Sequence, residues 1–369
     1  MLYNYFVLLN ILYFFVIIML ITGIIRLLRS AQEEKDYEPS TAFSILIPVR
    51  NEEKRITDLL KSLKELNYPK DLIEVVFLDD ESTDTTGQKI KWFISNSDFN
   101  VSYLVIKRID GVAPKKNLIE KGVEQAKHEY ILLLDADVNF SPSLLKGYNN
   151  VILESKADFI PGLVHLNYWE RESVFSRVQA LDFAGLISIG LGMAGLKNPS
   201  LCNGANLCFK KSSFLDVGGY SQYNHILSGD DVFLLEKMKK SGKLIIYNLN
   251  ELSMVLTTPK PTFNLFLKQR ARWGSKNFLY KNVGLMMLQL VFYSYYVLFF
   301  IIPLLSGIKA ILPWFLLKSL FDAGLVYPFL KKFDKDRFLL RSLFVTELFQ
   351  FIYLPLTGFY ILARKYDWN

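Results

Sequence analysis

The longest apolar run of the chain lies at its start. Residues 1–25 contain no charged side chain, and Arg26 and Arg29 follow directly. As a helix, such a run extends about 37 Å, which exceeds the roughly 30 Å hydrocarbon core of a bilayer. The run is longer than the apolar part of a cleaved signal peptide, and no basic residue precedes it. We therefore predict a membrane anchor over residues 1–28, with the domain after the two arginines in the cytoplasm.

Further apolar runs lie near the other end, over residues 282–308, 310–330 and 342–363. They predict about three membrane-spanning helices within residues 284–365. The second and third runs are interrupted by charged residues, namely Lys318, Asp322 and Glu347. Ionisable residues at membrane depth usually face a bundle interior or a polar cavity. The sequence leaves open whether these three pair with one another or line a path for an acceptor.

The middle of the chain, residues 40–257, alternates short apolar runs with amphipathic helical patterns. Strands are predicted over 43–49, 73–78, 101–107 and 130–134, and helices over 52–66, 85–95 and 117–127. Short apolar strands separated by helices are typical of an α/β domain with a parallel sheet. The segment 172–196 is also apolar, and we expect it to be a core or interfacial helix rather than a span, which would divide this domain.

The composition agrees with apolar ends around an ordinary globular middle. Hydrophobic residues make up 51% of the chain and charged residues 21%, and the mean hydropathy is +0.21. The net charge is +7, but no basic stripe with interleaved aromatic residues is present, so we expect no nucleic-acid partner. Basic residues beside an anionic membrane leaflet account better for this charge.

Polar clusters follow three of the predicted strands, where the ligands of open parallel sheets bind. The clusters are Arg50–Glu53, Asp79–Asp84 and Asp135–Asp137. Helix capping explains one acidic residue at a helix start, but it does not readily explain two consecutive aspartates at a strand end. Asp135 and Asp137 directly follow an apolar strand, and their hard oxygens suit Mg²⁺ or Mn²⁺ held partly by substrate phosphates.

Further short motifs continue the order of these clusters along the chain. They are Ser44–Glu53, Val76–Asp84, Asp135–Asp137, Asn203–Asn206, Val217–Tyr220, Ser228–Asp231 and Gln269–Trp273. The ordered set resembles the inverting glycosyltransferase family 2, and within it the membrane-integrated cellulose, chitin, hyaluronan and poly-N-acetylglucosamine synthases. The resemblance covers essentially the whole chain. It implies a GT-A fold, an α/β architecture with a Rossmann-like mixed sheet, flanking helices and transmembrane helices at both ends.

The resemblance also implies roles on the donor side of the site. A nucleotide-sugar donor is expected, with a UDP-sugar favoured because Asp80 occupies the position that contacts the nucleoside. The metal is expected on Asp137 together with Asp135. The full set of residues expected to bind the donor is Pro48, Arg50, Glu52, Asp80, Lys115 and Asp135.

On the acceptor side, Asp231 matches the family's catalytic base, and Asp230 replaces the usual glutamate before it with a side chain one methylene shorter. Residues 258–283 are expected to form an interfacial helix that carries the Gln-x-x-Arg-Trp signature. Gln269 and Arg272 lie three residues apart and share a helical face, from which the arginine can meet the departing diphosphate. The residues expected at the acceptor are Asn206, Asp230 and Trp273.

These observations predict a multi-pass enzyme of the cell membrane that transfers a sugar to a glycan or lipid acceptor. It either builds a polysaccharide processively or adds a single sugar to a lipid. Because only about three spans follow the catalytic domain, a processive enzyme would need a homo-oligomer or an accessory export subunit to complete a channel. A nucleotidyltransferase would leave Asp231 and the Gln269–Trp273 signature unexplained, and a non-catalytic membrane scaffold would not need a base.

Overall fold

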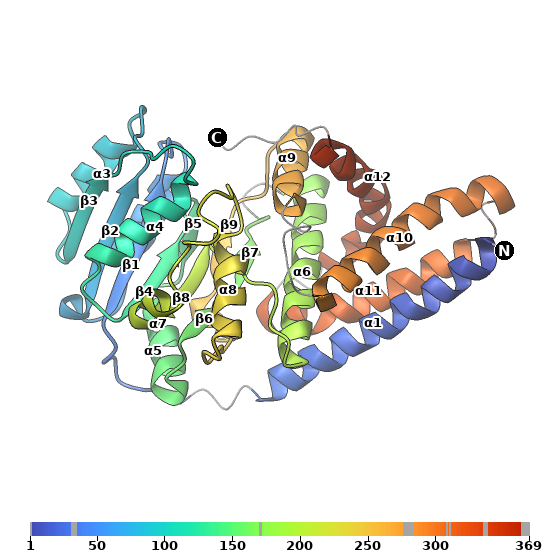
Figure 1. Cartoon of the computed structure of the whole chain (residues 1–369), viewed down its shortest axis with the longest axis horizontal. Coiled ribbons are helices and arrows are strands. Elements are labelled where there is room, and N and C mark those ends of the chain that lie inside the picture. The colour runs from blue at the N-terminus through green and yellow to red at the C-terminus, as the bar shows by residue number, and fades with distance from the viewer. Residues whose placement is uncertain are drawn as a thin grey trace. The chain divides into compact units, whose positions relative to one another are not determined.

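The computed structural model describes residues 2–30, 35–169, 172–275, 283–307, 309, 311–334 and 339–362. The chain divides into two compact units (Figure 1). The sheet unit comprises Ala31–His165 and Leu201–Thr258, and the helical unit comprises Met1–Ser30, Leu166–Ser200 and Pro259–Asn369. Parts of two predicted segments, residues 276–282 and 363–365, lie outside the described residues.

The sheet unit is built on a six-stranded sheet in the order β3-β2-β1-β4-β8-β6. The strands are β1 (Phe43–Val49), β2 (Ile73–Asp79), β3 (Asn100–Val105), β4 (Tyr130–Leu134), β6 (Phe159–Pro161) and β8 (Asn206–Lys210). The first four in chain order run parallel, whereas β8 is antiparallel to both β4 and β6. The sheet is therefore mixed, and the carboxyl ends of β1, β2 and β4 lie along one edge.

The apolar runs form central strands because helices cover both faces of the sheet. Every residue of β2 is buried, and all but one of β1. The helices of this unit are α2 (Ile56–Lys64), α3 (Thr86–Ser95), α4 (Pro114–Gln125), α5 (Leu144–Ser155), α7 (Lys211–Asp216) and α8 (Asp230–Lys240). A small second sheet, in the order β5-β9-β7, contains β5 (Val138–Phe140), β9 (Val255–Thr257) and β7 (Val164–Leu166). Short 3₁₀ helices cover Lys70–Leu72 and Glu251–Ser253.

Two helices of the sheet unit begin elsewhere than the sequence pattern predicts. The helix predicted from residue 52 begins at Ile56, because Glu52–Arg55 form a turn instead. The helix predicted from residue 117 begins three residues earlier, since Pro114 takes the first helical position, where its missing N–H has no helical partner to lose.

The helical unit contains α1 (Leu2–Ser30), α6 (Val174–Gly195), α9 (Phe263–Gly274), α10 (Val283–Ser306), α11 (Leu312–Phe333) and α12 (Leu343–Leu362), with a 3₁₀ turn over Leu339–Ser342. Within the described residues, three helical stretches are long and apolar enough to cross a membrane: Tyr3–Ser30, Val174–Gly195 and Leu339–Ile361. The second of these is the segment expected to be a core or interfacial helix, and most of it is buried inside the unit.

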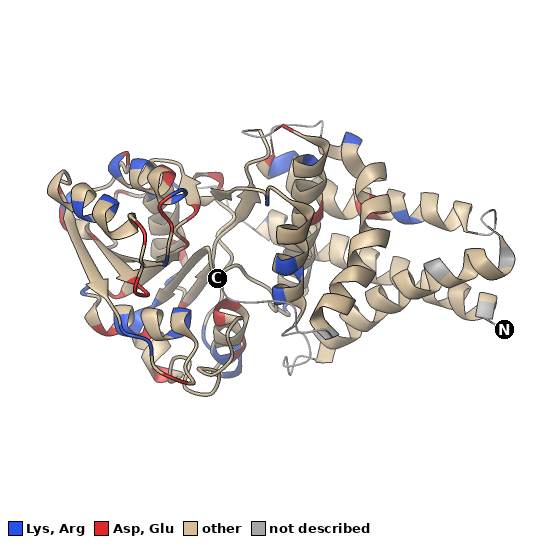
Figure 2. Cartoon of the chain, turned by 90° about the horizontal axis from the view of Figure 1, so that it is seen from above, with Lys and Arg blue, Asp and Glu red and all other residues tan. Residues whose placement is uncertain are grey.

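The two faces of α1 differ in burial although both are apolar. One face is buried, with Phe6, Tyr13, Ile17, Leu20 and Ile24. The other is exposed and also carries large apolar side chains, including Leu8, Ile11, Phe15 and Ile18. Lys, Arg, Asp and Glu are correspondingly sparse on the long helices and frequent over the sheet unit (Figure 2). Such a continuous exposed apolar face suits contact with lipid rather than with water.

Helices α1 and α6 approach each other closely at three glycines. A Cβ added to Gly23 would lie 2.1 Å from the carbonyl oxygen of Gly192, and one added to Gly195 would lie 1.9 Å from that of Gly23. Small residues at a contact let the backbones of two membrane helices come together. Glycine is therefore required at this crossing, which fixes how α1 lies on α6.

Ionisable side chains inside the helical unit are paired. The Lys318 ammonium contacts Asp322 Oδ2 at 2.7 Å and also contacts the Glu347 carboxylate. The Tyr13 hydroxyl donates to Asp322 Oδ1 at 2.6 Å, which links α1 to this cluster. Of the two alternatives that the sequence leaves open for these charges, the structure shows mutual pairing.

A second buried ion pair joins α6 to α9. The Arg270 Nη2 lies 2.6 Å from Asp182 Oδ2, and the Tyr353 hydroxyl donates to Asp182 Oδ1 at 2.6 Å. The guanidinium also lies over the rings of Phe266 and Trp273, at 4.7 and 4.5 Å from their centres. Arg270 thus attaches the helix that carries the Gln-x-x-Arg-Trp signature to Asp182 of α6, and the same aspartate accepts from Tyr353 of α12.

Candidate active site

Asp80 is the centre of a charged cluster at the carboxyl end of β2. The Arg50 Nη1 lies 2.7 Å from Asp80 Oδ2, and Arg108 approaches the carboxylate with two nitrogens, at 3.0 and 2.7 Å. Asp80 itself is only 4% exposed. Burial raises the pKa of its carboxyl to about 6, against the opposing effect of Arg50.

The neighbouring Asp79 makes structural contacts instead. Asp79 accepts hydrogen bonds from the Tyr103 hydroxyl and from the backbone N–H and hydroxyl of Ser82. Glu81, between these residues, adopts a positive φ of 53°. Asp79 therefore shapes the turn, and this leaves Asp80 as the aspartate presented at the strand end.

A second charged cluster joins the turn after β1 to the segment after β4. The Arg55 Nε lies 2.8 Å from Glu52 Oε2, and its Nη1 lies 3.3 Å from Asp137 Oδ2. Burial raises the pKa of Glu52 to about 7, Arg55 opposes the rise, and the carboxylates of Asp137 and Asp135 add to it. Glu52, Asp135 and Asp137 thus gather negative charge that a cation would stabilise.

Lys115 connects the segment after β4 with the start of α8. Its Nζ lies 2.7 Å from Asp135 Oδ1 and 3.1 Å from Asp230 Oδ2. Burial alone would lower the pKa of Lys115, but the two carboxylates together raise it above its usual value. Burial also raises the pKa of Asp135, with Lys115 opposing. This bridge brings the predicted metal ligand and the predicted acceptor-side aspartate to one lysine.

Asp231 occupies the second position of α8, after Gly229 at a positive φ of 82°. Its Oδ2 accepts from the Gly204 N–H at 3.1 Å, and its Oδ1 accepts from the Val232 N–H at 2.8 Å. A Cβ at position 204 would lie 2.9 Å from Asp230 Oδ2, so glycine lets this backbone approach the two carboxylates. Negative charge is also favourable in the first turn of a helix.

Two further predicted residues of the sheet unit, Pro48 and Asn206, lie in different surroundings. Pro48 lies in β1 opposite Leu78, beyond the pairing with β4, where its missing N–H breaks no ladder. Asn206 is fully buried, and its amide donates to the carbonyls of Leu163 and Ser253, both at 2.8 Å. The structure therefore places Asn206 inside the unit, where it joins two backbone segments.

The other predicted residues belong to α9 of the helical unit. Gln269, Arg272 and Trp273 are partly exposed there, whereas Arg270 between them is buried. The Trp273 ring lies between the Phe183 ring, at 5.9 Å between centres, and the Arg270 guanidinium. The buried Arg270 thus packs against Trp273 of the same helix.

The donor set after β4 fits a substrate-assisted metal site. Among the described residues, no group of three His, Cys, Asp or Glu side chains is arranged to hold a metal ion. Mg²⁺ and Mn²⁺ sites that use substrate phosphates need only one or two carboxylates from the protein. Asp135 and Asp137 supply such a pair of hard oxygen ligands.

Two arginines in these clusters were not predicted from the sequence. Arg108 follows β3, so the rule that ligands gather beyond the carboxyl ends of parallel strands would have indicated it. Arg55 lies in the predicted helix 52–66, and only the observed turn over Glu52–Arg55 brings it to Asp137.

Two family models match this chain. The model described as "Glycosyl transferase family 2" matches residues 44–198, and the one described as "Glycosyl transferase family group 2" matches residues 130–330, more than half of the chain. The chain belongs to glycosyltransferase family 2. The predicted family is confirmed, and with it the enzyme class that the family's name gives.

Curated relatives of this family member include bacterial polysaccharide synthases. The chain is 26% identical over 253 residues to the poly-beta-1,6-N-acetyl-D-glucosamine synthase of Staphylococcus epidermidis, covering 67% of this chain and 57% of the relative. It is likewise 26% identical over 238 residues to the synthase of the same name from Staphylococcus aureus strain COL, covering 63% and 53%. The chain thus spans little more than half the length of these relatives.

A solved structure supports the fold. The mannosyltransferase PcManGT of Pyrobaculum calidifontis, in complex with GDP-Man and Mn²⁺, superimposes with a TM-score of 0.56 at 16% sequence identity. The match covers 95% of this glycosyltransferase and 99% of that chain. The predicted α/β class, with a GT-A mixed sheet and helices at both ends that could span a membrane, is confirmed.

Proposed function

We propose that this family 2 enzyme transfers a sugar, with inversion, from a nucleotide sugar to a membrane-associated glycan or lipid, with Asp231 as the base. The observation that carries this proposal is the Lys115 bridge between Asp135 and Asp230. The bridge joins the expected metal ligand to the residue that precedes the proposed base, which supports a single site for both.

The donor would bind along the carboxyl ends of β1 and β2. The Asp80 carboxylate would accept a hydrogen bond from a nucleobase, and Arg50 and Arg108 fix its orientation. This arrangement suits a uracil base, whose ring N–H can donate to a carboxylate, and it supports a UDP-sugar as donor.

Asp137 and Asp135 would hold Mg²⁺ or Mn²⁺ together with the donor diphosphate. The bound ion would supply positive charge to the departing diphosphate. The cations beside these carboxylates, Arg55 and Lys115, balance their charge within the protein. The complex of PcManGT with Mn²⁺ supports a divalent metal for this site.

Asp231 would take the proton of the acceptor hydroxyl. The acceptor oxygen forms a bond to the sugar anomeric carbon as the bond from that carbon to the diphosphate oxygen breaks, and the configuration inverts. Hydrogen bonds from the Gly204 and Val232 N–H groups fix the orientation of the carboxylate. Such positioned proton transfer contributes roughly 10²- to 10⁴-fold in rate.

The signature helix α9 would serve the leaving group and the acceptor. Arg272 would meet the diphosphate with its planar fork, Gln269 would support it from the same face, and Trp273 would stack against an acceptor sugar. Asp230 would contact the acceptor, whereas the buried Asn206 would act only through the backbone segments that it joins.

The enzyme would work at the cytoplasmic face of the cell membrane as a multi-pass protein. The functional regions would be an anchor over 1–28, a catalytic domain over 40–257, the signature helix within 258–283 and a membrane region over 284–365. The exposed apolar face of α1 supports the membrane contact.

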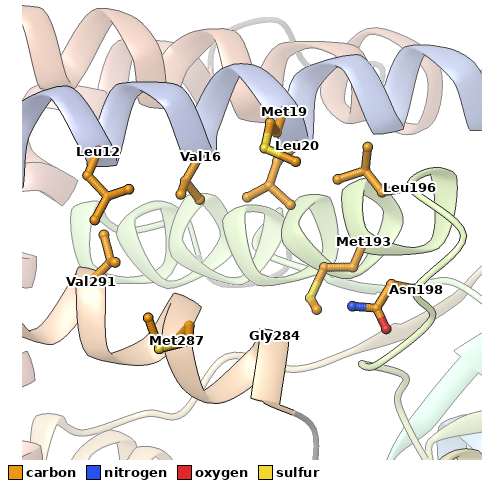
Figure 3. A pocket seen from close by; sticks show the side chains of 10 residues that line it. All are labelled: Leu12, Val16, Met19, Leu20, Met193, Leu196, Asn198, Gly284, Met287 and Val291. Carbon is orange, nitrogen blue, oxygen red and sulfur yellow. The ribbon is translucent and has the colours of Figure 1, made fainter.

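The product is either a polysaccharide or a glycolipid. The synthases among the relatives favour a polymer, made with the help of a homo-oligomer or an accessory export subunit. A pocket of about 380 Å³ in the helical unit favours a lipid acceptor as the second candidate. Its lining is apolar and comes from α1, α6 and α10, with Asn198 at one end, so it suits a hydrocarbon chain (Figure 3).

Product size separates these two modes. The purified protein, in vesicles, is incubated with a panel of labelled nucleotide sugars and Mn²⁺, and products are resolved by gel and by thin-layer chromatography. A ladder or long polymer supports the synthase, and a single lipid-soluble spot supports single addition. A separate incubation with a nucleoside triphosphate and a sugar 1-phosphate tests the nucleotidyltransferase, which would release pyrophosphate as it forms the nucleotide sugar.

Asp231→Asn tests the base directly. Nucleoside diphosphate release should fall at least about 10²-fold, with unchanged affinity for UDP. Asp216→Asn is the matched control, because Asp216 is an exposed aspartate of the same unit that pairs with Lys243, and it should keep the wild-type rate. An Asp231→Asn enzyme within tenfold of wild type would refute the assignment, and a wild-type protein inactive with every donor would favour a scaffold.

A further inference from the structure

A stretch without helix or strand leads into the base-bearing helix α8, and a buried lysine holds it. Lys116 on α4 is 1% exposed. Its Nζ donates to the carbonyl oxygens of Tyr223 and Ile226, both at 2.7 Å, and to that of Ser228 at 3.2 Å. Ser228 is two residues before Asp230, so the last of these contacts lies next to the start of α8.

Other contacts of α4 and α8 support the same attachment. The Ala113 N–H, at the start of α4, donates to the Asn224 carbonyl at 2.6 Å. The Lys116 ammonium also lies 5.1 Å from the centre of the Phe233 ring on α8. The start of α4 therefore binds the stretch 223–228 through the backbone N–H of Ala113 and through the side chain of Lys116.

The position of Lys116 is costly for α4 itself. Lys115 and Lys116 both lie in the first turn, which contains no acidic residue. Cations at a helix N-terminus are disfavoured by the positive end of the helix dipole. Contacts outside the helix compensate this unfavourable placement. Lys115 pairs with Asp135 and Asp230, and Lys116 bonds the carbonyls before α8.

We propose that Lys116 is a positioning residue for the catalytic base. By holding the Tyr223, Ile226 and Ser228 carbonyls, it fixes the entry into α8 and thereby the place of Asp231 relative to the donor edge. This inference rests on the proposed function, in which Asp231 takes the acceptor proton. A displacement of about 1 Å at a reacting group can reduce the rate about 10²-fold, so loss of this clamp should act mainly on turnover.

A second buried lysine provides a matched control for this clamp. Lys237, near the far end of α8 from Asp231, also donates to backbone carbonyls, at Gly218 and Gly219, but these precede the stretch 223–228 and are farther along the chain from Asp230. If any loosening of the chain before α8 reduced activity, replacing either lysine would have the same kinetic effect. If Lys116 acts on the base, only its replacement should reduce kcat.

The experiment compares Lys116→Met, Lys116→Gln, Lys116→Arg and Lys237→Met in the full chain. Nucleoside diphosphate release gives kcat and the donor KM, and UDP binding reports an intact donor edge. Lys116→Met should lower kcat at least about tenfold with the donor KM within about twofold of wild type. The kcat of Lys116→Gln should be intermediate, because glutamine keeps a hydrogen-bond donor but no charge, and Lys116→Arg should recover most of kcat. The kcat of Lys237→Met should stay within about threefold of wild type.

Each remaining outcome decides the proposal. A Lys116→Met enzyme with wild-type kcat overturns it, and so does a parallel loss of kcat and UDP affinity, which would show a general structural role. If the Met variant does not fold, Lys116→Gln decides, and a kcat within twofold of wild type overturns the proposal. An equal effect of Lys237→Met also overturns it.

Asp231→Asn measured in parallel separates this inference from the proposed function. If Asp231→Asn keeps the wild-type rate, the assigned base is wrong whatever Lys116 does. If Asp231→Asn is inactive and Lys116→Met is normal, only the role of Lys116 fails. On an Asp231→Asn background, Lys116→Met should reduce the residual rate by less than twofold, because a clamp that acts through the base has nothing left to position.

Discussion

The sheet unit and the helical unit each bury a lysine completely, and each surrounds it differently. Lys116 in the sheet unit donates to three neutral carbonyl oxygens, and Lys318 in the helical unit contacts two carboxylates. Both ammonium groups also lie over aromatic rings, at 5.1 Å from Phe233 and 5.2 Å from Tyr296. In these contacts the partner atoms differ in charge.

The partners of each buried lysine agree with the outer surface of its unit, which is charged in the sheet unit and apolar in the helical unit. The sheet unit carries many charged residues (Figure 2), and backbone dipoles stabilise its buried Lys116. The apolar outer face of a helix bundle does not stabilise a buried cation, so a cation inside the bundle needs an opposite charge close by. Buried charge in the helical unit should therefore be less tolerant of single substitutions than buried charge in the sheet unit.

Lys318→Met should have the largest effect, because it leaves Asp322 and Glu347 together without their cation. Removing one partner of a buried ion pair costs about 3–5 kcal/mol, and here two carboxylates lose theirs. Thermal unfolding of the protein in lipid nanodiscs should show a strongly lowered midpoint. The matched control neutralises the whole cluster, as Lys318→Met with Asp322→Asn and Glu347→Gln, and should restore most of the stability. No recovery in this triple variant would contradict the ion-pair explanation.

Asp182→Ala should follow, with a loss of about 3 kcal/mol, since it leaves the buried Arg270 without its carboxylate. The signature helix should also loosen, which limited proteolysis or hydrogen exchange over Phe263–Gly274 can detect. Asp182→Leu with Arg270→Met removes both charges and should unfold near the wild-type temperature. Equal loss in the single and double variants would show that packing rather than charge holds α9.

Lys116→Met should destabilise the sheet unit less, by about 1–3 kcal/mol, the cost of leaving buried carbonyls without a donor. Its unfolding midpoint should thus fall between those of Lys318→Met and wild type. Lys121→Met serves as the control, because Lys121 is an exposed lysine of the same helix that pairs with Glu124. If Lys116→Met were as damaging as Lys318→Met, the contrast between the two units would be wrong.

The smallest effect expected is a pH dependence at the donor edge. Burial raises the pKa of Asp80 to about 6, so its carboxylate is mainly ionised at pH 7 and becomes protonated as the pH falls below 6. If only the carboxylate accepts from the base, UDP affinity should fall by up to about tenfold per pH unit below 6, or about 1.4 kcal/mol. Calorimetric titration with UDP between pH 5 and 8 measures this. Asp80→Asn should bind weakly with no slope in this range, and an unchanged slope would assign the titration to another group.

The sequence predicts the strands well because burial on both faces leaves them almost purely apolar. β1 and β4 have their predicted bounds, and β2 differs by one residue. The site was predictable to the extent that its residues follow such strands, as Asp80 and Asp135 do. The apolar pattern alone does not distinguish Asp79 from Asp80. Only the family resemblance indicates Asp80, and the contact that engages Asp79 comes from Tyr103, which is distant in sequence.

The contacts that join distant segments could not be predicted at all. Nothing in the local pattern shows that Lys116 reaches carbonyls more than a hundred residues away, because a lysine in a first helical turn normally faces solvent. The apolar pattern of α6 indicated burial but not its contact with α1, since glycine spacing on one helix does not identify the partner.

The glycine contact between α1 and α6 has a consequence for biosynthesis. Gly23 and Gly192 are 169 positions apart, so at 5–20 residues per second the ribosome needs roughly 10 to 30 s to deliver the second helix after the first. During that interval Gly23 has no contact with α6, and Tyr13, which stacks on Tyr295 of α10, waits longer still for its partner. An apolar helix of equal length with a larger residue in place of Gly23 could not bring its backbone this close to α6, however hydrophobic it was.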